Sequence, residues 1–221
     1  LGHEVAGGVI YVKGDDSIRP GQRVVVHPHI YCGHCENCIE GRENLCLNVK
    51  GSYGITLDGG LSQYLIVPTK NLIPIPDNIS DEEAALAGGV VAVPLSALRE
   101  LNMNLINKKA LVIGLGALAF AAIQLLKTMG AIVIAIGRRE HKLNLAKNLG
   151  ADYTFDSTKG DYVEYVKEIT HDLGVDLAMD FAGDPNEVPK LINTLKRGGT
   201  LVIIGYTNKN IVLPYQKIAL D

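Results

Sequence analysis

The chain has 221 residues with a formal net charge of −3, and 47% of them are hydrophobic, a composition ordinary for a water-soluble protein of one large or two small domains. Lysines and arginines are scattered and tryptophan is absent, which argues against a nucleic-acid-binding surface. The longest apolar run, residues 110–126, is shorter than the ~20 residues of a membrane span and is broken by Gly114 and Gly116. We therefore expect a soluble, cytoplasmic protein that binds neither nucleic acid nor membranes.

The first 76 residues are expected to form β structure, as a small barrel or sandwich. Short runs rich in β-branched residues, bounded by Gly, Pro and Asp, predict strands over 5–12, 22–26 and 62–68. The segment 72–76 carries two prolines, which suit the edge of a sheet. The sequence begins without methionine and ends in mid-pattern, so we expect a fragment that lacks material at both ends.

The four cysteines of the chain fall within fifteen residues, as Cys32, Cys35, Cys38 and Cys46. Their spacing predicts a zinc site, because two-residue gaps let loops aim successive sulfurs at one tetrahedral ion. A redox C-x-x-C pair normally stands alone near a βαβ unit, and a pair of disulfides suits a secreted chain; neither context is present here. Four thiolates leave no open coordination position, so the expected zinc is structural, and His34 is interpreted as a solvated loop residue.

Ser80 and Glu83 form a capping-box pattern that predicts the start of a linking helix, which continues to about Leu101. This helix is either continuous or interrupted near the glycines at 88–89 and near Pro94. From Lys108 onward, strand-like and helix-like segments alternate, which predicts a parallel, doubly wound sheet. The expected strands are 110–113, 131–136, 153–155, 175–180 and 200–204, and the expected helices are 117–129, 140–149, 162–170 and 189–195.

Gly114-Leu115-Gly116 joins the first of these strands to the first helix, with Ala119 at a third small position. In this context the loop predicts a dinucleotide site, since Gly114 permits the turn and Gly116 lets the backbone approach a pyrophosphate at the helix N-terminus. A plain tight turn is the alternative. The cofactor-binding residues in this interpretation are Gly114, Gly116, Ala117, Leu118, Gly137, Arg138, Arg139 and Gly205.

The end of the second strand indicates which dinucleotide is bound. NAD-binding domains usually carry Asp or Glu there for the ribose 2′-hydroxyl, whereas this chain reads Gly137-Arg138-Arg139. Guanidinium groups bind a 2′-phosphate through charge-assisted hydrogen bonds, so we expect NADP(H) to be preferred over NAD(H). The alternative is a solvated basic helix start, where cations face the positive end of the helix dipole.

Several further residues have two possible interpretations. Asp180 ends the fourth strand, and it either borders the cofactor or acts as a structural cap. Gly205, with the pair at 198–199, either lets the backbone approach the nicotinamide or forms ordinary turns. Tyr53 and Tyr64 are candidate proton donors by residue type, with core packing as the alternative.

Taken in order, these motifs resemble the zinc-containing medium-chain dehydrogenase/reductases, the alcohol dehydrogenase superfamily. The matching features are the Gly2-His3-Glu4-x-x-Gly7 motif, the four-cysteine lobe, the Pro76-Asp77 turn and the Gly114-Leu115-Gly116 loop. The resemblance covers essentially the whole chain and implies an α/β protein of two domains. It implies a GroES-like β-barrel catalytic domain over 1–90, with its zinc lobe at about 27–50, and a Rossmann doubly wound parallel sheet over 91–221. It also implies a homodimer or homotetramer.

In that family a catalytic zinc is held by an upstream Cys, by the His of the G-H-E motif and by a third ligand from the linking helix. The resemblance assigns His3, and the neighbouring acid Glu4, to this site. The upstream Cys would precede Leu1, and the third ligand should fall at 87–90, which reads Ala-Gly-Gly-Val and offers none. His3 is therefore either a zinc ligand or a packed core histidine.

The resemblance implies an NADP(H)-dependent oxidoreductase that transfers hydride between the nicotinamide and a small alcohol, aldehyde or ketone, with zinc polarising the oxygen. Without a catalytic zinc, it implies a reductase of activated C=C bonds, of the quinone or enoyl thioester type. A different class of alternative is a non-catalytic protein that keeps the dinucleotide site as a sensor or scaffold. The sequence identifies neither the substrate nor the favoured direction.

Overall fold

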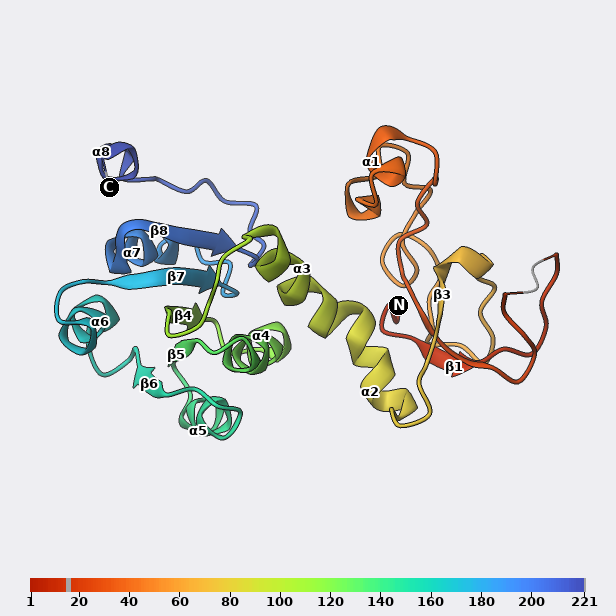
Figure 1. The fold of residues 1–221 in the computed structure, drawn as a ribbon, viewed down its shortest axis with the longest axis horizontal. Coiled ribbons are helices and arrows are strands. Elements are labelled where there is room, and N and C mark those ends of the chain that lie inside the picture. The colour runs from red at the N-terminus through yellow and green to blue at the C-terminus, as the bar shows by residue number, and fades with distance from the viewer. Residues whose placement is uncertain (15–16, 221) are drawn as a thin grey trace. The chain divides into compact units, whose positions relative to one another are not determined.

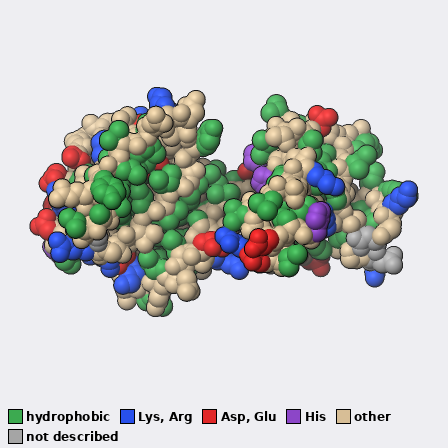
Figure 2. Space-filling model, turned by 90° about the horizontal axis from the view of Figure 1, so that it is seen from above, with side chains coloured by type: hydrophobic (Ala, Val, Ile, Leu, Met, Phe, Trp, Pro, Cys, Tyr) green, Lys and Arg blue, Asp and Glu red, His purple; other side chains and the backbone are tan. Residues whose placement is uncertain are grey.

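A computed structural model describes residues 1–14 and 17–220 and divides the chain into two compact units, Leu1–Ala92 and Val93 onward (Figure 1). Within the described part of the chain, no helix is both long and apolar enough to cross a membrane. On the face shown in Figure 2, acidic and basic side chains are interspersed with hydrophobic ones.

The first unit is built on a three-stranded antiparallel sheet with the order β1-β2-β3. Its strands are β1 (Ala6–Gly8), β2 (Arg23–Val26) and β3 (Leu72–Pro74). The central strand is the valine run, and its three valines are buried. Val25, Ile75 and Ala84 form a small core with Ala6 and Ile79 packed on it. The sheet therefore has a hydrophobic face that helix α2 (Asp81–Leu86) covers.

Two of the expected strands differ from the structure. Within the segment 5–12 only β1 is a strand, although Val5 adds a backbone hydrogen bond with Val26, and Val9 adds bonds with residues 21 and 22. The segment 62–68 forms no strand, so that prediction is wrong. A strand needs a partner for its backbone groups, and within the described residues none lies beside 62–68. Local side chains meet some of these groups instead: the Tyr53 hydroxyl donates to Ile66 O (2.8 Å), and the Ser62 hydroxyl donates to Tyr64 O (2.8 Å).

The cysteine lobe lies between β2 and β3 in the chain. It contains one short α-helix, α1 (Glu36–Ile39), and one 3-10 turn, η1 (Glu43–Leu45). A second 3-10 turn, η2 (Thr69–Asn71), leads into β3. Asn71 is fully buried, and its amide donates to the carbonyls of His27 (2.9 Å) and His29 (2.6 Å), which fastens the start of the lobe to the sheet.

The expected linking helix is present and its cap is confirmed. α2 (Asp81–Leu86) begins with Ser80, whose hydroxyl accepts from Glu83 N (3.2 Å) while Ser80 N donates to the Glu83 carboxylate (2.9 Å). η3 (Ala87–Val91) then follows as a π-helix, and α3 (Ala92–Glu100) resumes the α-helix. The glycine pair at 88–89 therefore marks a widened turn rather than a break. Pro94 lies inside this continuous helix and has no N–H to donate to the preceding turn, which is the widened one.

The second unit contains the predicted parallel sheet, with five strands in the order β6-β5-β4-β7-β8. Its strands are β4 (Lys109–Ile113), β5 (Ile132–Gly137), β6 (Tyr153–Asp156), β7 (Val175–Asp180) and β8 (Leu195–Ile203). Its remaining helices are α4 (Ala117–Thr128), α5 (Glu140–Asn148), α6 (Tyr162–Thr170), α7 (Glu187–Thr194) and α8 (Tyr215–Leu220). The strand order reverses between β4 and β7, where open α/β sheets bind ligands.

Side chains alternate across this sheet, as expected for strands buried on both faces. Ala110 and Val112 of β4 join a core cluster with residues of α4 and α5. Leu111 and Ile113 join a second cluster with residues of α6 and α7. Helices therefore cover both faces (Figure 1), and the fold class is confirmed as a Rossmann-type sheet.

Candidate functional site

The four cysteine side chains converge on one point, as their spacing predicts. Their sulfur atoms all lie within 4.8 Å of one another, with pairs at 3.4 Å (Cys35–Cys38), 3.9 Å (Cys32–Cys38) and 4.0 Å (Cys35–Cys46). Four thiolates 2.3 Å from a tetrahedral zinc lie about 3.8 Å apart, whereas bonded sulfurs lie about 2 Å apart. All four cysteines are free. The donor set and its spacing therefore fit zinc and not disulfides.

Backbone N–H groups of the lobe point at these sulfurs. Cys32 N donates to the Cys46 sulfur (3.3 Å), and Cys35 N donates to the Cys32 sulfur (3.3 Å). Hydrogen bonds of this kind, the largest contribution coming from the His34 backbone, lower the pKa of Cys32 to about 5. Burial instead raises the pKa of Cys38 to about 12. The hydrogen bonds thus favour the thiolate form of Cys32. A bound cation would stabilise the thiolate form of the buried Cys38.

The catalytic zinc predicted at His3 and Glu4 has a weaker donor set. Both side chains are exposed, just before β1. A β-carbon added to Gly89 of η3 would lie 3.3 Å from Glu4 Oε1 and 3.8 Å from His3 Cδ2, whereas one on Gly88 would face Val26 O of β2 at 3.4 Å. Gly89 is therefore the residue of the helical region that faces the pair, and it has no side chain.

Zinc in proteins is held by three or four protein donors. Across residues 1–14 and 17–220, the cysteine lobe is the one place where three or more His, Cys, Asp or Glu donors converge. The His3–Glu4 pair with Gly89, here called the His3–Glu4 corner, brings two. The residues present therefore bring too few donors to fit a catalytic zinc.

Another histidine near the corner has a defined partner. His29 Nδ1 lies 2.5 Å from the buried hydroxyl of Ser52. The pKa of His29 is lowered mainly by burial and further by His27 and His3. His29 is therefore hydrogen-bonded, and its environment favours the neutral ring. Tyr53, a candidate proton donor by type, is buried and donates its hydroxyl proton to Ile66 O, while Tyr64 is exposed.

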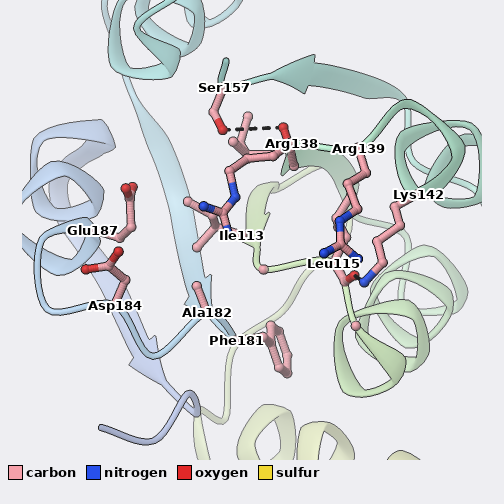
Figure 3. A pocket seen from close by; sticks show the side chains of 14 residues that line it. Ile113, Leu115, Arg138, Arg139, Lys142, Ser157, Phe181, Ala182, Asp184 and Glu187 are labelled. Atoms are coloured by element: carbon pink, nitrogen blue, oxygen red, sulfur yellow. Dashed lines mark hydrogen bonds between the residues drawn. The ribbon is translucent and has the colours of Figure 1, made fainter.

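A cavity of about 420 Å³ opens at the carboxyl edge of the sheet, where the strand order reverses (Figure 3). Gly114 and Gly116 of the glycine loop line it. Gly114 has φ +88°, a conformation that favours glycine, and a β-carbon on Gly116 would meet nothing closer than Gly114 O at 3.9 Å. Open space over Gly116, at the N-terminus of the twelve-residue α4, fits a pyrophosphate.

Arg139 and Lys142 lie beside the glycine loop in this cavity, Arg138 reaches toward its middle, and Asp184 and Glu187 lie on the other side (Figure 3). Arg138 and Arg139, which follow β5, line the cavity together with Lys142 of α5 and Ser157 after β6. Neither guanidinium makes a hydrogen bond or ion pair with another described residue. Lys142 donates to Leu115 O (2.8 Å), and the Ser157 hydroxyl lies 3.4 Å from Gly137 O (Figure 3). Two unpaired cations and a hydroxyl form an environment suited to a phosphate.

Not every predicted cofactor residue lines the cavity. Gly137 does, whereas Ala117, Leu118 and Gly205 are absent from its lining. The first two lie in the first turn of α4, and Gly205 packs against Gly183. Sequence reasoning missed Lys142, Ser157, Phe181, Ala182, Asp184 and Glu187. Lys142 could have been found, because it lies one helical turn after Arg138 and Arg139, and Ser157 because it follows a strand at the binding edge.

Comparison with known families covers most of the chain. The family model described as alcohol dehydrogenase GroES-like domain matches residues 1–77, and the one described as zinc-binding dehydrogenase matches residues 117–221. Together with the cysteine lobe, these matches show that the chain belongs to the zinc-containing medium-chain dehydrogenase/reductases of the alcohol dehydrogenase superfamily.

Individual relatives agree with this family. L-threonine 3-dehydrogenase of Chromobacterium violaceum is 30% identical over 99% of this chain and 63% of its own length. Sorbitol dehydrogenase of Bacillus subtilis is 35% identical over 95% of this chain and 60% of its own length. A solved putative zinc-binding dehydrogenase from Sinorhizobium meliloti, bound to NADP, has a TM-score of 0.90 and 32% identity over 99% of this chain and 65% of that one. The chain thus spans about three fifths of the length of the curated relatives it matches.

Proposed function

We infer that this protein is an NADP(H)-dependent oxidoreductase that transfers hydride between the nicotinamide and a small alcohol, aldehyde or ketone. The observation that carries this proposal is the cavity at the carboxyl edge of the sheet, which is lined by a glycine loop and by two unpaired guanidinium groups. The bound nicotinamide would supply or accept the hydride. The chain's own residues would bind and orient the cofactor.

The preference for NADP(H) rests on charge. Gly137, Arg138 and Arg139 occupy the end of β5, so a carboxylate that would repel a 2′-phosphate is absent there. Arg138 reaches toward the middle of the cavity, and Arg139 and Lys142 lie on its right-hand side in Figure 3. A solved relative of the same fold is bound to NADP, which supports the same cofactor here. Relatives named for threonine and sorbitol support an alcohol-type substrate.

Nucleotide titration tests this proposal directly. We expect Arg138→Asp to weaken NADPH binding at least tenfold and to leave NADH binding equal or improved, because the new carboxylate repels the 2′-phosphate. The control is Lys147→Asp, which makes the same change in charge near the other end of α5, at an exposed residue outside the cavity. Equal NADPH affinity in wild type and Arg138→Asp would reject the charge argument.

A second candidate function does not depend on a donor at Gly89. A reductase of activated C=C bonds, which needs NADPH and a proton donor but no catalytic metal, is compatible with the two donors described at the His3–Glu4 corner. Turnover of an enone or quinone by the protein in the presence of a chelator, with no alcohol oxidation, would select this reductase. Tight NADPH binding with no turnover of alcohols, carbonyls or enones would indicate a sensor or scaffold instead.

A further inference from the structure

Asp180, the last residue of β7, directly precedes the cavity-lining Phe181 and carries a buried carboxyl group, with only 1% of the residue's surface exposed. Four backbone N–H groups converge on it. Its side-chain Oδ1 accepts from Ala182 N (2.8 Å) and Gly183 N (3.4 Å), and its carbonyl oxygen accepts from Ile204 N and Gly205 N (both 2.8 Å). One residue therefore joins the loop after β7 to the segment after β8.

The other carboxyl oxygen, Oδ2, is buried and has no hydrogen-bond partner among the described residues. A buried, half-paired carboxylate is costly in free energy. Burial raises the pKa of Asp180, although the Ala182 and Gly183 N–H groups oppose this, and nearby Glu187 and Asp184 add to the rise. These groups therefore favour the neutral acid more than water does, and the neutral acid has nearly the shape of an asparagine side chain.

The loop after β7, residues 181–183, fits tightly between two other backbones. A β-carbon on Gly114 would lie 2.7 Å from both Phe181 C and Ala182 Cα. One on Gly183, which has φ +65°, would lie 2.6 Å from Tyr206 O. Because these contacts are between backbones, the loop cannot shift without moving its neighbours. Phe181 and Ala182 also line the dinucleotide cavity, so the position of this loop sets one wall of the site.

We propose that Asp180 is a positioning residue of the dinucleotide site: its side chain fixes the 181–183 loop against the glycine loop, in the arrangement that forms the cavity wall. The proposal rests on the dinucleotide binding inferred above. Asp180 touches no cofactor in this role and acts through the backbone N–H groups of Ala182 and Gly183. What matters is an acceptor oxygen at the Oδ1 position, and not a negative charge.

The test is titration of the purified protein with NADPH, beside thermal unfolding without nucleotide. Asp180→Ala removes the acceptor, and we expect its Kd for NADPH to rise at least tenfold. Asp180→Asn keeps an acceptor oxygen in a neutral group of the same shape, and we expect its Kd to stay within about threefold of wild type. The matched control is Asp176→Ala on the same strand, which removes a bond to Lys109 N and ion pairs with Lys108 and Lys196.

A purely structural role would make Asp180→Ala behave like Asp176→Ala, with a lower unfolding temperature and unchanged Kd. That result, or an Asp180→Asn protein that binds as weakly as Asp180→Ala, would overturn the proposal. If Asp180→Ala fails to fold, Gly183→Ala displaces the same loop from the other side; it is expected to raise the Kd, and an unchanged Kd there would also overturn the proposal. A wild-type protein that binds neither NADPH nor NADH would instead reject the proposed function, in the first titration.

Discussion

The cysteine lobe and the His3–Glu4 corner both belong to the first unit, and they differ in how many segments supply their donors. All four thiols of the lobe come from one stretch of fifteen residues. The corner combines the start of the chain with Gly89 of η3, which follows both the sheet and the lobe. When all donors of a metal site lie in one short motif, that motif alone shows whether the donor set is complete. A site assembled from distant segments can lose a donor through one residue while the fold is kept.

The largest effect is expected in the lobe. Replacing the buried Cys38 by serine should abolish zinc retention and lower the free energy of unfolding of the first unit by on the order of 4 kcal/mol or more, because loss of a structural metal is among the most destabilising changes. The measurements are zinc per chain by elemental analysis and hydrogen exchange over residues 30–50. His34→Ala, at an exposed residue of the same loop, is the control and should keep the zinc. A Cys38→Ser protein with a full zinc content would show that the lobe does not need all four thiols to hold its zinc.

The corner should respond in the opposite direction, by gaining a metal. In Gly89→Cys the new β-carbon would lie 3.3 Å from Glu4 Oε1 and 3.8 Å from His3 Cδ2, and the flexible Glu4 side chain can give way. With His3 and Glu4 the new thiol completes a three-donor set, so we expect zinc per chain to rise from about one to about two under reducing conditions.

Gly89→Ser is the matched control for this gain, since its hydroxyl has the same placement but is a poor zinc ligand. An unchanged zinc content in Gly89→Cys would show that the corner lacks more than one donor, or that its geometry cannot accept a metal.

These differences explain how much the sequence could predict. The lobe and the glycine loop are contiguous motifs, so the four thiols that converge and the two glycines that line the cavity could be predicted from the sequence. The cavity wall formed by Phe181 and Ala182 could not, because it depends on backbone contacts with Gly114 that no local pattern encodes. The strand expected at 62–68 failed for the same reason: its β-branched pattern is local, but a strand also needs a neighbour.

A smaller effect is expected at the helix that leads to Gly89. Ser80→Ala removes the cap of α2 and should lower the free energy of unfolding by about 1 kcal/mol, with zinc content unchanged. Urea unfolding measures this loss. Ser96→Ala, at an exposed position inside α3 with no cap to lose, is the control and should change stability little or slightly increase it. Equal losses in both variants would mean that the cap does not stabilise the helix.

The same cap gives a pH dependence with a definite sign. The hydrogen bond from Ser80 N lowers the pKa of Glu83. The stabilisation is therefore present above the ordinary pKa of glutamate and is lost as the pH falls through the lowered pKa of the folded state. Urea unfolding of wild type and Glu83→Gln should therefore differ at neutral pH and converge in acid. A difference that persists in acid would assign the effect to the shape of the side chain and not to its charge.

The last prediction is an absence of change, and it tests the comparison most directly. If the His3–Glu4 corner holds no zinc, His3→Ala should leave zinc per chain at about one, because all four donors of that ion are thiols in the lobe. The Cys38→Ser protein gives the reference for a lost zinc in the same assay. Combining His3→Ala with Gly89→Cys sharpens the result, since the gained zinc should disappear with the imidazole. The opposite result would be a wild-type protein with two zinc ions, one of which is lost in His3→Ala. It would show that donors outside the described residues complete the corner, and that a catalytic metal can bind there although Gly89 supplies no donor.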